Sequence, residues 1–322
     1  MIRRRTTLFA AAGWLAAGTA RADDAAPVPK PGKRDWAAQV PVIRIGLLGG
    51  ENDADRLGRY GPYGKLLEDT FEVSTRMFSA ADYAGVIQAF AAKQLEICYM
   101  SPAAYAGAWL ESDGDVKPLL TAKEADGSIS YKAAMLVRAD SDIKDLAGMK
   151  GRSLAWADPN SASGYLIPRS ELRKQGIDPE PGKYFSRTGF GGGHEQAMVA
   201  VLQKQYDASV TWVSGVGDPA QGYTRGAMHE MVAKGMMKPG ELRPIWLSDP
   251  ILNGPLTVRK STPQSFRDDM LAFHLALATW QPAIFQQIQL GTASGFARVK
   301  HEDYQPFIDL RREEAANRRK RS

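Results

Sequence analysis

Residues 153–175 read SLAWADPNSASGYLIPRSELRKQ, and this stretch decides the fold class. The short apolar run at 153–157 predicts a buried strand, and the Pro-Asn pair at 159–160 predicts the turn that ends it. Ser161 occupies the N-cap position of a helix that we expect over 162–175. A strand that leads through a tight turn into a helix is typical of βαβ units and therefore of a parallel sheet.

The same alternation of strands and helices continues on both sides of this stretch. On the N-terminal side the pattern predicts strands at 42–49, 71–78 and 95–100, and helices at 63–70, at 81–94 and from 102 onward. On the C-terminal side it predicts helices at 194–205 and 263–288, and strands at 208–213, 243–248 and 256–259. Segments 117–123 and 131–138 flank a turn sequence and predict a hairpin.

These two blocks indicate an α/β protein with two lobes, each a βαβ sheet flanked by helices, because 322 residues are too many for one small core. The polar, Pro-rich segment DDAAPVPKPGKRDWAAQV indicates disorder. We therefore assign the chain as follows: 1–22 signal peptide, 23–40 disordered lead-in, 41–139 with 245–310 first lobe, 140–244 second lobe, and 311–322 basic tail.

The N-terminus has the pattern of an export signal. Three arginines at 3–5 precede the apolar stretch LFAAAGWLAAGT at 8–19, and ARA at 20–22 predicts cleavage before Asp23. The apolar stretch is shorter than the roughly 20 residues that span a bilayer. We expect a soluble protein of the periplasm, and the sequence leaves open whether it is exported through the Sec or the twin-arginine route.

The basic balance of the chain is concentrated at its ends. The net charge of the whole chain is +5. Residues 1–22 contain four arginines and no acid, so the remainder of the chain has a net charge of +1. The segment RREEAANRRKRS at 311–322 contributes six bases and two acids, which is typical of a solvated, frayed terminus. Since no bases alternate with aromatic residues in the body of the chain, we exclude nucleic-acid binding.

The turn at 157–164 is a candidate anion site. The small residues at 162–164 leave the first-turn amides of the helix uncovered, where unpaired N–H groups and the positive end of the helix dipole attract anions. The hydroxyls of Ser161 and Ser163 add donors that suit tetrahedral oxygens. Alternatively, Ser161 only caps its own helix, and spacing alone favours neither interpretation.

Four stretches resemble the phosphonate-binding periplasmic proteins. They are DPNSASGYLIP at 158–168, ADYAGVIQ at 81–88, EICYMSP at 96–102 and GHEQA at 193–197. The resemblance implies a type II periplasmic binding protein, a venus flytrap that captures phosphate, phosphite or a small phosphonate for an ABC importer. It also implies a monomer that contacts a permease, contains no cofactor and is not an enzyme.

The resemblance implies the ligand-binding residues position by position. Ser161, Ala162, Ser163 and Gly164 would bind oxygens at the helix start, and His194 would donate to the same oxygens. Tyr83 would close over the ligand from the first lobe. Met100 and Ser101 follow the third strand, where the family has a tyrosine that reaches the ligand.

Two departures from the family pattern concern the ligand itself. Ala162 stands where the family commonly has threonine, so one side-chain donor is missing. The acids that hold an aminoalkyl ammonium are matched by Ser214 and by Gly254 or Asn253. Because a buried ammonium without a carboxylate is costly, this argues against aminoethylphosphonate.

Cys98, the only cysteine, supports an alternative function. It lies two residues from Met100 on a predicted strand, so both side chains share one face, which is most often a core face. If both sulfurs instead faced the cleft, they would suit a soft ligand. The alternative is then an arsenite sensor that binds through Cys98 and signals to a membrane histidine kinase.

The sequence contains no pattern for catalysis or metal binding. No Gly-x-Ser-x-Gly elbow surrounds either serine of the candidate site, and no His-x-x-x-His or Cys-x-x-Cys pair occurs. We therefore expect a binding protein with no metal and no cofactor.

Overall fold

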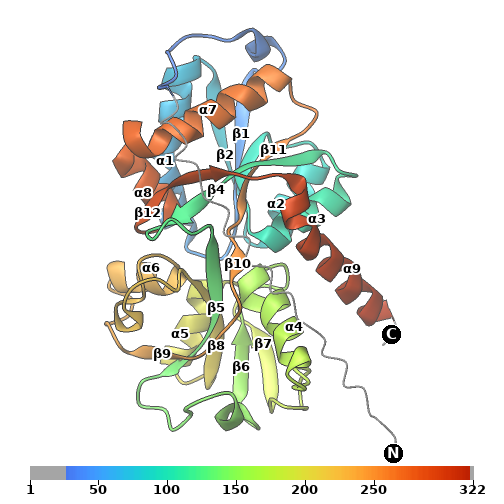
Figure 1. Ribbon diagram of the computed structural model, residues 1–322, viewed down its shortest axis with the longest axis vertical. Helices are drawn as coiled ribbons and strands as arrows, with labels where there is room; N and C mark the ends of the chain where they lie inside the picture. The colour runs from blue at the N-terminus through green and yellow to red at the C-terminus, as the bar shows by residue number, and fades with distance from the viewer. Residues whose placement is uncertain (1–26, 320–322) are drawn as a thin grey trace, which may run out of the picture.

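The computed structural model describes residues 27–319 and divides them between two six-stranded sheets, one in each lobe (Figure 1). The sheet of the first lobe has the order β12-β4-β11-β3-β1-β2. Its strands are β1 (Val42–Leu47), β2 (Ser74–Ser79), β3 (Ile97–Tyr99), β4 (Val116–Glu124), β11 (Pro255–Arg259) and β12 (Ala293–Arg298). β1 pairs in parallel with β2 and β3, whereas β11 and β12 run antiparallel to their partners.

The sheet of the second lobe has the order β10-β5-β8-β6-β7, with β9 also paired to β5. Its strands are β5 (Ser130–Arg138), β6 (Ser153–Trp156), β7 (Arg187–Phe190), β8 (Ala208–Val213), β9 (Leu242–Leu247) and β10 (Ile251–Leu252). β6 pairs in parallel with β7 and β8. The expected parallel βαβ units are therefore present in both lobes, and the predicted two-lobed α/β architecture is confirmed.

Helices cover both sheets. The first lobe carries α1 (Asp53–Phe71), α2 (Tyr83–Ala91), α3 (Pro102–Glu111), α7 (Gln264–Trp280) and α8 (Pro282–Gln289), and the second carries α4 (Ile167–Lys174), α5 (His194–Leu202) and α6 (Ala227–Ala233). The helix α9 (Gln305–Arg319) follows β12. No described helix is both long enough and apolar enough to cross a bilayer.

The predicted hairpin at 117–138 is wrong, because its two segments belong to different sheets. β4 pairs with β11 and β12, whereas β5 pairs with β8, β9 and β10. The chain thus passes between the lobes at 125–129 and returns at 253–254. These crossings differ from the boundaries we predicted at 139/140 and 244/245, since residue pattern alone does not tell which sheet a strand joins.

The segment 27–40 is ordered, in contrast to the predicted lead-in, of which 23–26 lies outside the described residues. A short 3₁₀ turn at Asp35–Ala38 buries Trp36, whose exposure is 1%. Its indole Nε1 donates to Asp269 Oδ2 at 2.7 Å, and its ring packs edge-on against Phe71 and Phe266. Ala37 and Val40 are buried in the same apolar cluster, so a few apolar side chains, Trp36 above all, anchor a segment whose average composition is that of a disordered chain.

The long helix α1 begins ten residues before the predicted start at 63. Gly58, Gly61 and Pro62 obscured it, because both glycine and proline disfavour helix interiors. The side chain of Asn52 caps the N-terminus of α1, because its Oδ1 accepts hydrogen bonds from the amides of Ala54 and Asp55.

The C-terminal segment 311–319 is helical, as part of α9, and not frayed as predicted. Arg311 and Glu314 pack on the protein, whereas residues 312, 313, 315, 316 and 319 are exposed, as expected for a solvated segment. Phe307 and Ile308 of α9 are buried in the apolar cluster that includes α3. Glu314 is only 5% exposed.

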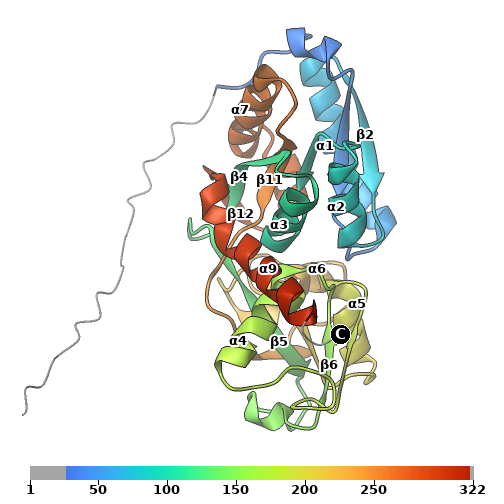
Figure 2. The ribbon, with the colours of Figure 1, turned by 90° about the vertical axis from the view of Figure 1, so that its right-hand side faces the viewer.

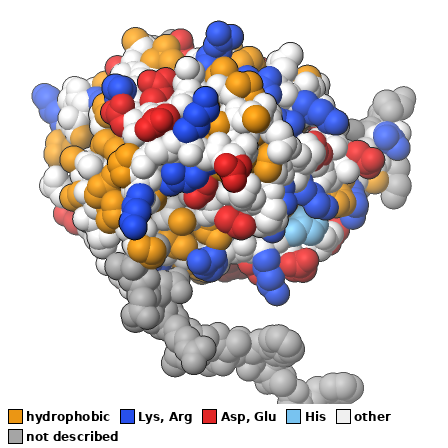
Figure 3. All heavy atoms as spheres, turned by 90° about the horizontal axis from the view of Figure 1, so that it is seen from above, with side chains coloured by type: hydrophobic (Ala, Val, Ile, Leu, Met, Phe, Trp, Pro, Cys, Tyr) orange, Lys and Arg blue, Asp and Glu red, His pale blue; other side chains and the backbone are white. Residues whose placement is uncertain are grey.

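On the outer face of the first lobe, side chains of both charges are interspersed with apolar ones (Figure 3).

Candidate functional site

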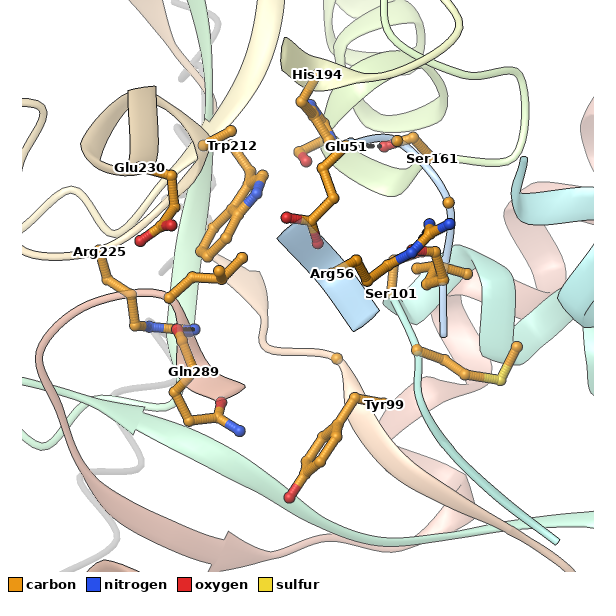
Figure 4. Close-up of a pocket in the computed structure, with 18 of the residues that line it drawn as sticks. Glu51, Arg56, Tyr99, Ser101, Ser161, His194, Trp212, Arg225, Glu230 and Gln289 are labelled. Atoms are coloured by element: carbon orange, nitrogen blue, oxygen red, sulfur yellow. Dashed lines mark hydrogen bonds between the residues drawn. The ribbon is translucent and has the colours of Figure 1, made fainter. Parts of the chain in front are cut away.

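A cavity of about 210 Å³ lies between the lobes, where residues of both lobes meet the crossing at 253–254 (Figure 4). From the first lobe, its lining includes Gly50, Glu51, Arg56, Arg59, Tyr60, Tyr83, Met100 and Ser101. From the second lobe, it includes Tyr131, Ser161, Ser163, His194, Trp212, Arg225, Glu230 and Lys234. Six of the eight predicted ligand-binding residues line this one cavity: Tyr83, Met100, Ser101, Ser161, Ser163 and His194.

The predicted anion turn has an unusual helical geometry. Residues Ala162–Leu166 form one π-helical turn before α4, in which the Leu166 amide donates to the Ser161 carbonyl at 3.1 Å. Ser161 Oγ accepts the Gly164 amide at 3.0 Å, so Ser161 caps its helix and that amide is already used. Single π-helical turns are often found at functional sites.

The two remaining predicted residues of this turn support it without lining the cavity. Ala162 is fully buried, and a Cβ on Gly164 would lie 3.0 Å from the His194 ring and 2.5 Å from the Ala157 side chain. Glycine at position 164 therefore allows His194 to approach the turn. Neither residue lines the cavity, and the Gly164 amide already donates to Ser161 Oγ, so a contribution of Ala162 and Gly164 to ligand binding through their backbone amides stays a prediction.

Two tyrosines face the two serines. Burial raises the pKa of the Tyr83 phenol, and the neighbouring Ser161 hydroxyl opposes that shift. Tyr131 and Ser163 form the same kind of pair. Tyr83 comes from the first lobe and Tyr131 from β5, so four hydroxyl groups converge on one end of the cavity. Each hydroxyl both donates and accepts.

His194 lies at the start of α5 against the same turn. Its Nε2 is 3.3 Å from Ser161 Oγ (Figure 4). Its Nδ1 is 3.2 Å from Thr211 Oγ1. Burial lowers the pKa of the imidazole to about 4, so the ring is neutral at pH 7. A neutral imidazole carries one N–H donor and one acceptor nitrogen.

Met100 and Cys98 do not share an environment, although they lie two apart on one strand. Met100 lines the cavity, whereas Cys98 is 1% exposed and packs where β1 approaches, with its Sγ 3.3 Å from the position of a Cβ on Gly46. Burial raises the pKa of the Cys98 thiol. Cys98 is buried and is not among the residues that line the cavity, so the alternative arsenite site at Cys98 is not supported.

The other end of the cavity contains Arg225 and Trp212, which the sequence did not indicate, beside Asn253, which it did. Arg225 forms a bidentate ion pair with the buried Glu124, at 3.1 and 2.7 Å, and its guanidinium lies 5.0 Å from the Trp212 ring centre. Asn253, at the second crossing, donates to Glu124 Oε1 at 2.8 Å. Because Glu124 belongs to β4 of the first lobe and Arg225 to the second lobe, this ion pair links the two lobes.

Acidic side chains also reach this cavity. Glu51 binds Arg59, with one contact at 2.6 Å, and Lys234 of the second lobe lies 3.0 Å from Asp55 of the first. Burial raises the pKa of the Glu230 carboxyl, and no hydrogen bond to that carboxylate occurs among residues 27–319. The sequence argument against an ammonium ligand rested on Ser214 and on Gly254 or Asn253. It concerns those positions only, since the carboxylates of Glu51, Glu195 and Glu230 also line the cavity.

The lobes are closed on one another in this structure. A Cβ on Gly193 would lie 2.5 Å from the backbone of Gly50 in the opposite lobe. The Tyr83 amide approaches Asp158 Oδ2 across the same boundary at 3.4 Å. Only glycine permits such close backbone contact.

Known proteins share both sequence and fold with this chain. It is 28% identical over 216 residues to the phosphate-import protein PhnD of Mycolicibacterium smegmatis, covering 65% of this chain and 64% of that protein. It is 26% identical over 242 residues to the phosphonates-binding periplasmic protein of Escherichia coli, covering 74% of this chain and 66% of that protein. Each match thus spans slightly less than two thirds of the relative's own length.

Two solved structures have the same fold. A binding protein component of an ABC phosphonate transporter from Pseudomonas aeruginosa superposes with a TM-score of 0.72 at 24% identity, over 84% of this chain and 85% of that one. PhnD1 of Prochlorococcus marinus, in complex with methylphosphonate, superposes with a TM-score of 0.71 at 16% identity, over 85% of this chain and 98% of that one. The family model described as "ABC transporter, phosphonate, periplasmic substrate-binding protein" matches residues 45–304, and this chain belongs to that family.

Proposed function

We propose that this protein captures a small phosphorus oxyanion in the periplasm and delivers it to the permease of an ABC importer. The observation that carries the proposal is the convergence of four hydroxyls, one neutral imidazole and a helix start at one end of an interlobe cavity. The names of the relatives support the same ligand class.

The donor set suits an oxyanion that still carries a proton. Ser161, Ser163, Tyr83 and Tyr131 can each donate to an anionic oxygen or accept from a P–OH group, and His194 offers one N–H and one acceptor. Hydrogen bonds to a charged partner are each worth about 1.5–3 kcal/mol. Several such bonds in a closed cavity hold an anion firmly, and the positively charged side chains of Arg56, Arg59, Arg225 and Lys234 also line this cavity.

The shape of the cavity favours an organic phosphonate over inorganic phosphate. The cavity extends beyond the hydroxyl end, past Trp212, which packs edge-on against Tyr131, to Glu230 and Gln289 (Figure 4). A short substituent on phosphorus would extend toward these residues. The unbonded carboxylate of Glu230 would accept a hydrogen bond from a hydroxyl or an ammonium group on it.

The contact between Ser161 and His194 does not amount to a catalytic pair. A catalytic serine requires a histidine that is basic enough to take its proton and is oriented by a third group, usually a carboxylate. Here the imidazole pKa is about 4, its other nitrogen faces the neutral hydroxyl of Thr211, and Ser161 Oγ accepts an amide proton. We therefore propose binding without turnover.

Calorimetric titration with a matched set of anions tests the proposal. Phosphate, phosphite, methylphosphonate and 2-aminoethylphosphonate vary the substituent, and sulfate serves as the tetrahedral control that carries no proton at neutral pH. We expect binding of at least one phosphorus compound and none of sulfate at the same concentration. Absence of heat with all four phosphorus compounds, or release of product from a model phosphoester, would contradict the proposal.

The substituent is tested with Glu230→Gln, which removes the negative charge and keeps the size of the side chain. If 2-aminoethylphosphonate places its ammonium beside Glu230, this variant should weaken its binding about tenfold and leave methylphosphonate unchanged, since a hydrogen bond between charged groups contributes about 1.5–3 kcal/mol. Equal effects on both compounds would argue that Glu230 does not contact the substituent.

A further inference from the structure

The helix α9 connects the two lobes on the outside of the molecule. It leaves the first lobe beside α3, passes the level of the cleft and ends next to α4 of the second lobe (Figure 2). Its first turns are held by Phe307 and Ile308, which are buried together with residues of α3. Its later turns carry charged side chains that contact the second lobe.

Arg311 lies where α9 passes from one lobe to the other. Its Nε donates to the carbonyl oxygen of Ala103 in α3 at 2.6 Å, and its Nη2 donates to Asn160 Oδ1 in the second lobe at 3.0 Å. Gly107 of α3 makes room for this side chain, because a Cβ there would lie 2.8 Å from the guanidinium carbon. One side chain thus bridges a helix of the first lobe and the turn that carries Ser161.

The turn that Arg311 contacts is also bound to the other wall of the cavity. Asp158 is 3% exposed and accepts the Asn160 amide at 2.6 Å, and it approaches the Tyr83 amide at 3.4 Å. Burial raises the pKa of the Asp158 carboxyl, and the charge of Arg311 opposes that shift. Arg311 therefore acts on both Asn160 and Asp158, which lie between the two ligand-binding residues Ser161 and Tyr83.

A second contact of α9 holds the helix that follows the turn. Glu314 forms ion pairs with Arg173 and, at 3.7 Å, with Arg169, both on α4. Arg173 also pairs with Glu180 at 2.9 Å. Since α4 continues directly from the π-helical turn, α9 holds the anion turn from both sides.

From this geometry we propose that Arg311 is a positioning residue for ligand binding, and that α9 is a strap that holds the anion turn of the second lobe against the first lobe in the closed state. The proposal rests on the function proposed above. Contacts made across the cleft stabilise the closed form, and a ligand that binds the closed form gains affinity as that form becomes more populated.

The test compares Arg311→Met, which removes the guanidinium at similar length, with Arg312→Met as the matched control. Arg312 is the next residue on α9, and its side chain is 53% exposed. With methylphosphonate as the probe, we expect Arg311→Met to weaken binding about tenfold, mainly through faster dissociation, because it loses hydrogen bonds from a charged group. Arg312→Met should stay within twofold of the wild type.

Two further variants separate positioning from general stability. Arg311→Lys keeps a positive charge beside Asp158 and should recover part of the affinity. Gly107→Ala keeps arginine at position 311, but the added methyl group should displace the guanidinium and therefore also weaken ligand binding. A purely structural residue would lower the free energy of unfolding and leave the dissociation rate unchanged, and that result would overturn the proposal.

Hydrogen exchange of the ligand-free protein tests the proposed role of α9 as a strap without the use of a ligand. In Arg311→Met, amides of 159–166 should exchange at least several-fold faster than in the wild type, and those of β1 should not change. Unchanged exchange at 159–166 would refute the strap whatever the ligand proves to be. If the wild type binds no phosphorus compound but exchange at 159–166 still responds, the proposed function fails and the strap stands.

Discussion

The two serines of the anion turn differ in one contact, and this difference yields a quantitative prediction. Ser161 Oγ accepts the Gly164 amide, whereas no such backbone contact involves Ser163 among the described residues. Both hydroxyls line the cavity and both are at least 98% buried. Changing each serine to alanine removes one hydroxyl without adding volume.

The structure sets the expected magnitudes. Ser163→Ala should cost about 1.5–3 kcal/mol of binding free energy, or roughly 10- to 150-fold in affinity, as one hydrogen bond to a charged ligand is lost. Ser161→Ala should lose a similar amount of affinity and, in addition, about 1 kcal/mol of unfolding free energy, because it also removes the helix cap. Ser163→Ala should leave the unfolding free energy close to that of the wild type.

Calorimetry with the best ligand of the set measures affinity, and urea unfolding of the ligand-free variants measures stability. Ser170→Ala is the matched control, since Ser170 lies on α4 outside the residues that line the cavity. Affinity within twofold of the wild type in both Ser161→Ala and Ser163→Ala would refute the placement of the anion at this turn. Equal stability losses in the two variants would refute the distinct capping role of Ser161.

Three further predictions follow from buried groups. Cys98→Ala should leave ligand affinity within a few-fold and lower the unfolding free energy by about 1 kcal/mol for a small void, and arsenite should give no heat with the wild type; arsenite heat that disappears in the variant would contradict the burial argument. Burial lowers the pKa of both His194 and His274 from 6.5 to about 4, so between these pH values the unfolded state binds more protons than the folded state. The free energy of unfolding should therefore fall by up to about 3 kcal/mol per histidine as the pH drops from 6.5 to 4. Urea unfolding as a function of pH measures this, and a flat profile over that range would refute it. Trp36→Ala should cost about 3–5 kcal/mol of unfolding free energy, as expected for a buried aromatic ring, and a loss below 1 kcal/mol would show that 27–40 does not contribute to the core.

Local patterns in the sequence were sufficient to predict the strand, turn and helix around Ser161. The strand at 153–157, the N-cap and the helix start all depend on neighbours within a few residues, and the structure has them at these positions. The match of the motif residues to one family also indicated His194 and Tyr83, which line the same cavity as Ser161. Here short-range backbone preferences and a specific motif carried the information.

Other features depended on which distant segments meet. Tyr131, Trp212 and Glu230 carry no local signal for ligand binding, and they reach the cavity only because β5, β8 and α6 assemble around it. In the same way, the hydrophobic pattern of β5 identified a strand but not its sheet. Residues of this kind are found only when the pairing of the strands is known.

The basic segment at 311–319 shows the physical reason most clearly. Its composition predicted a solvated tail, since isolated like charges avoid burial. The tertiary structure places Asn160 and a carbonyl of α3 beside Arg311, and two arginines of α4 beside Glu314. The free energy of a charged side chain depends on the partners that surround it, and those partners come from segments more than one hundred residues away in the chain.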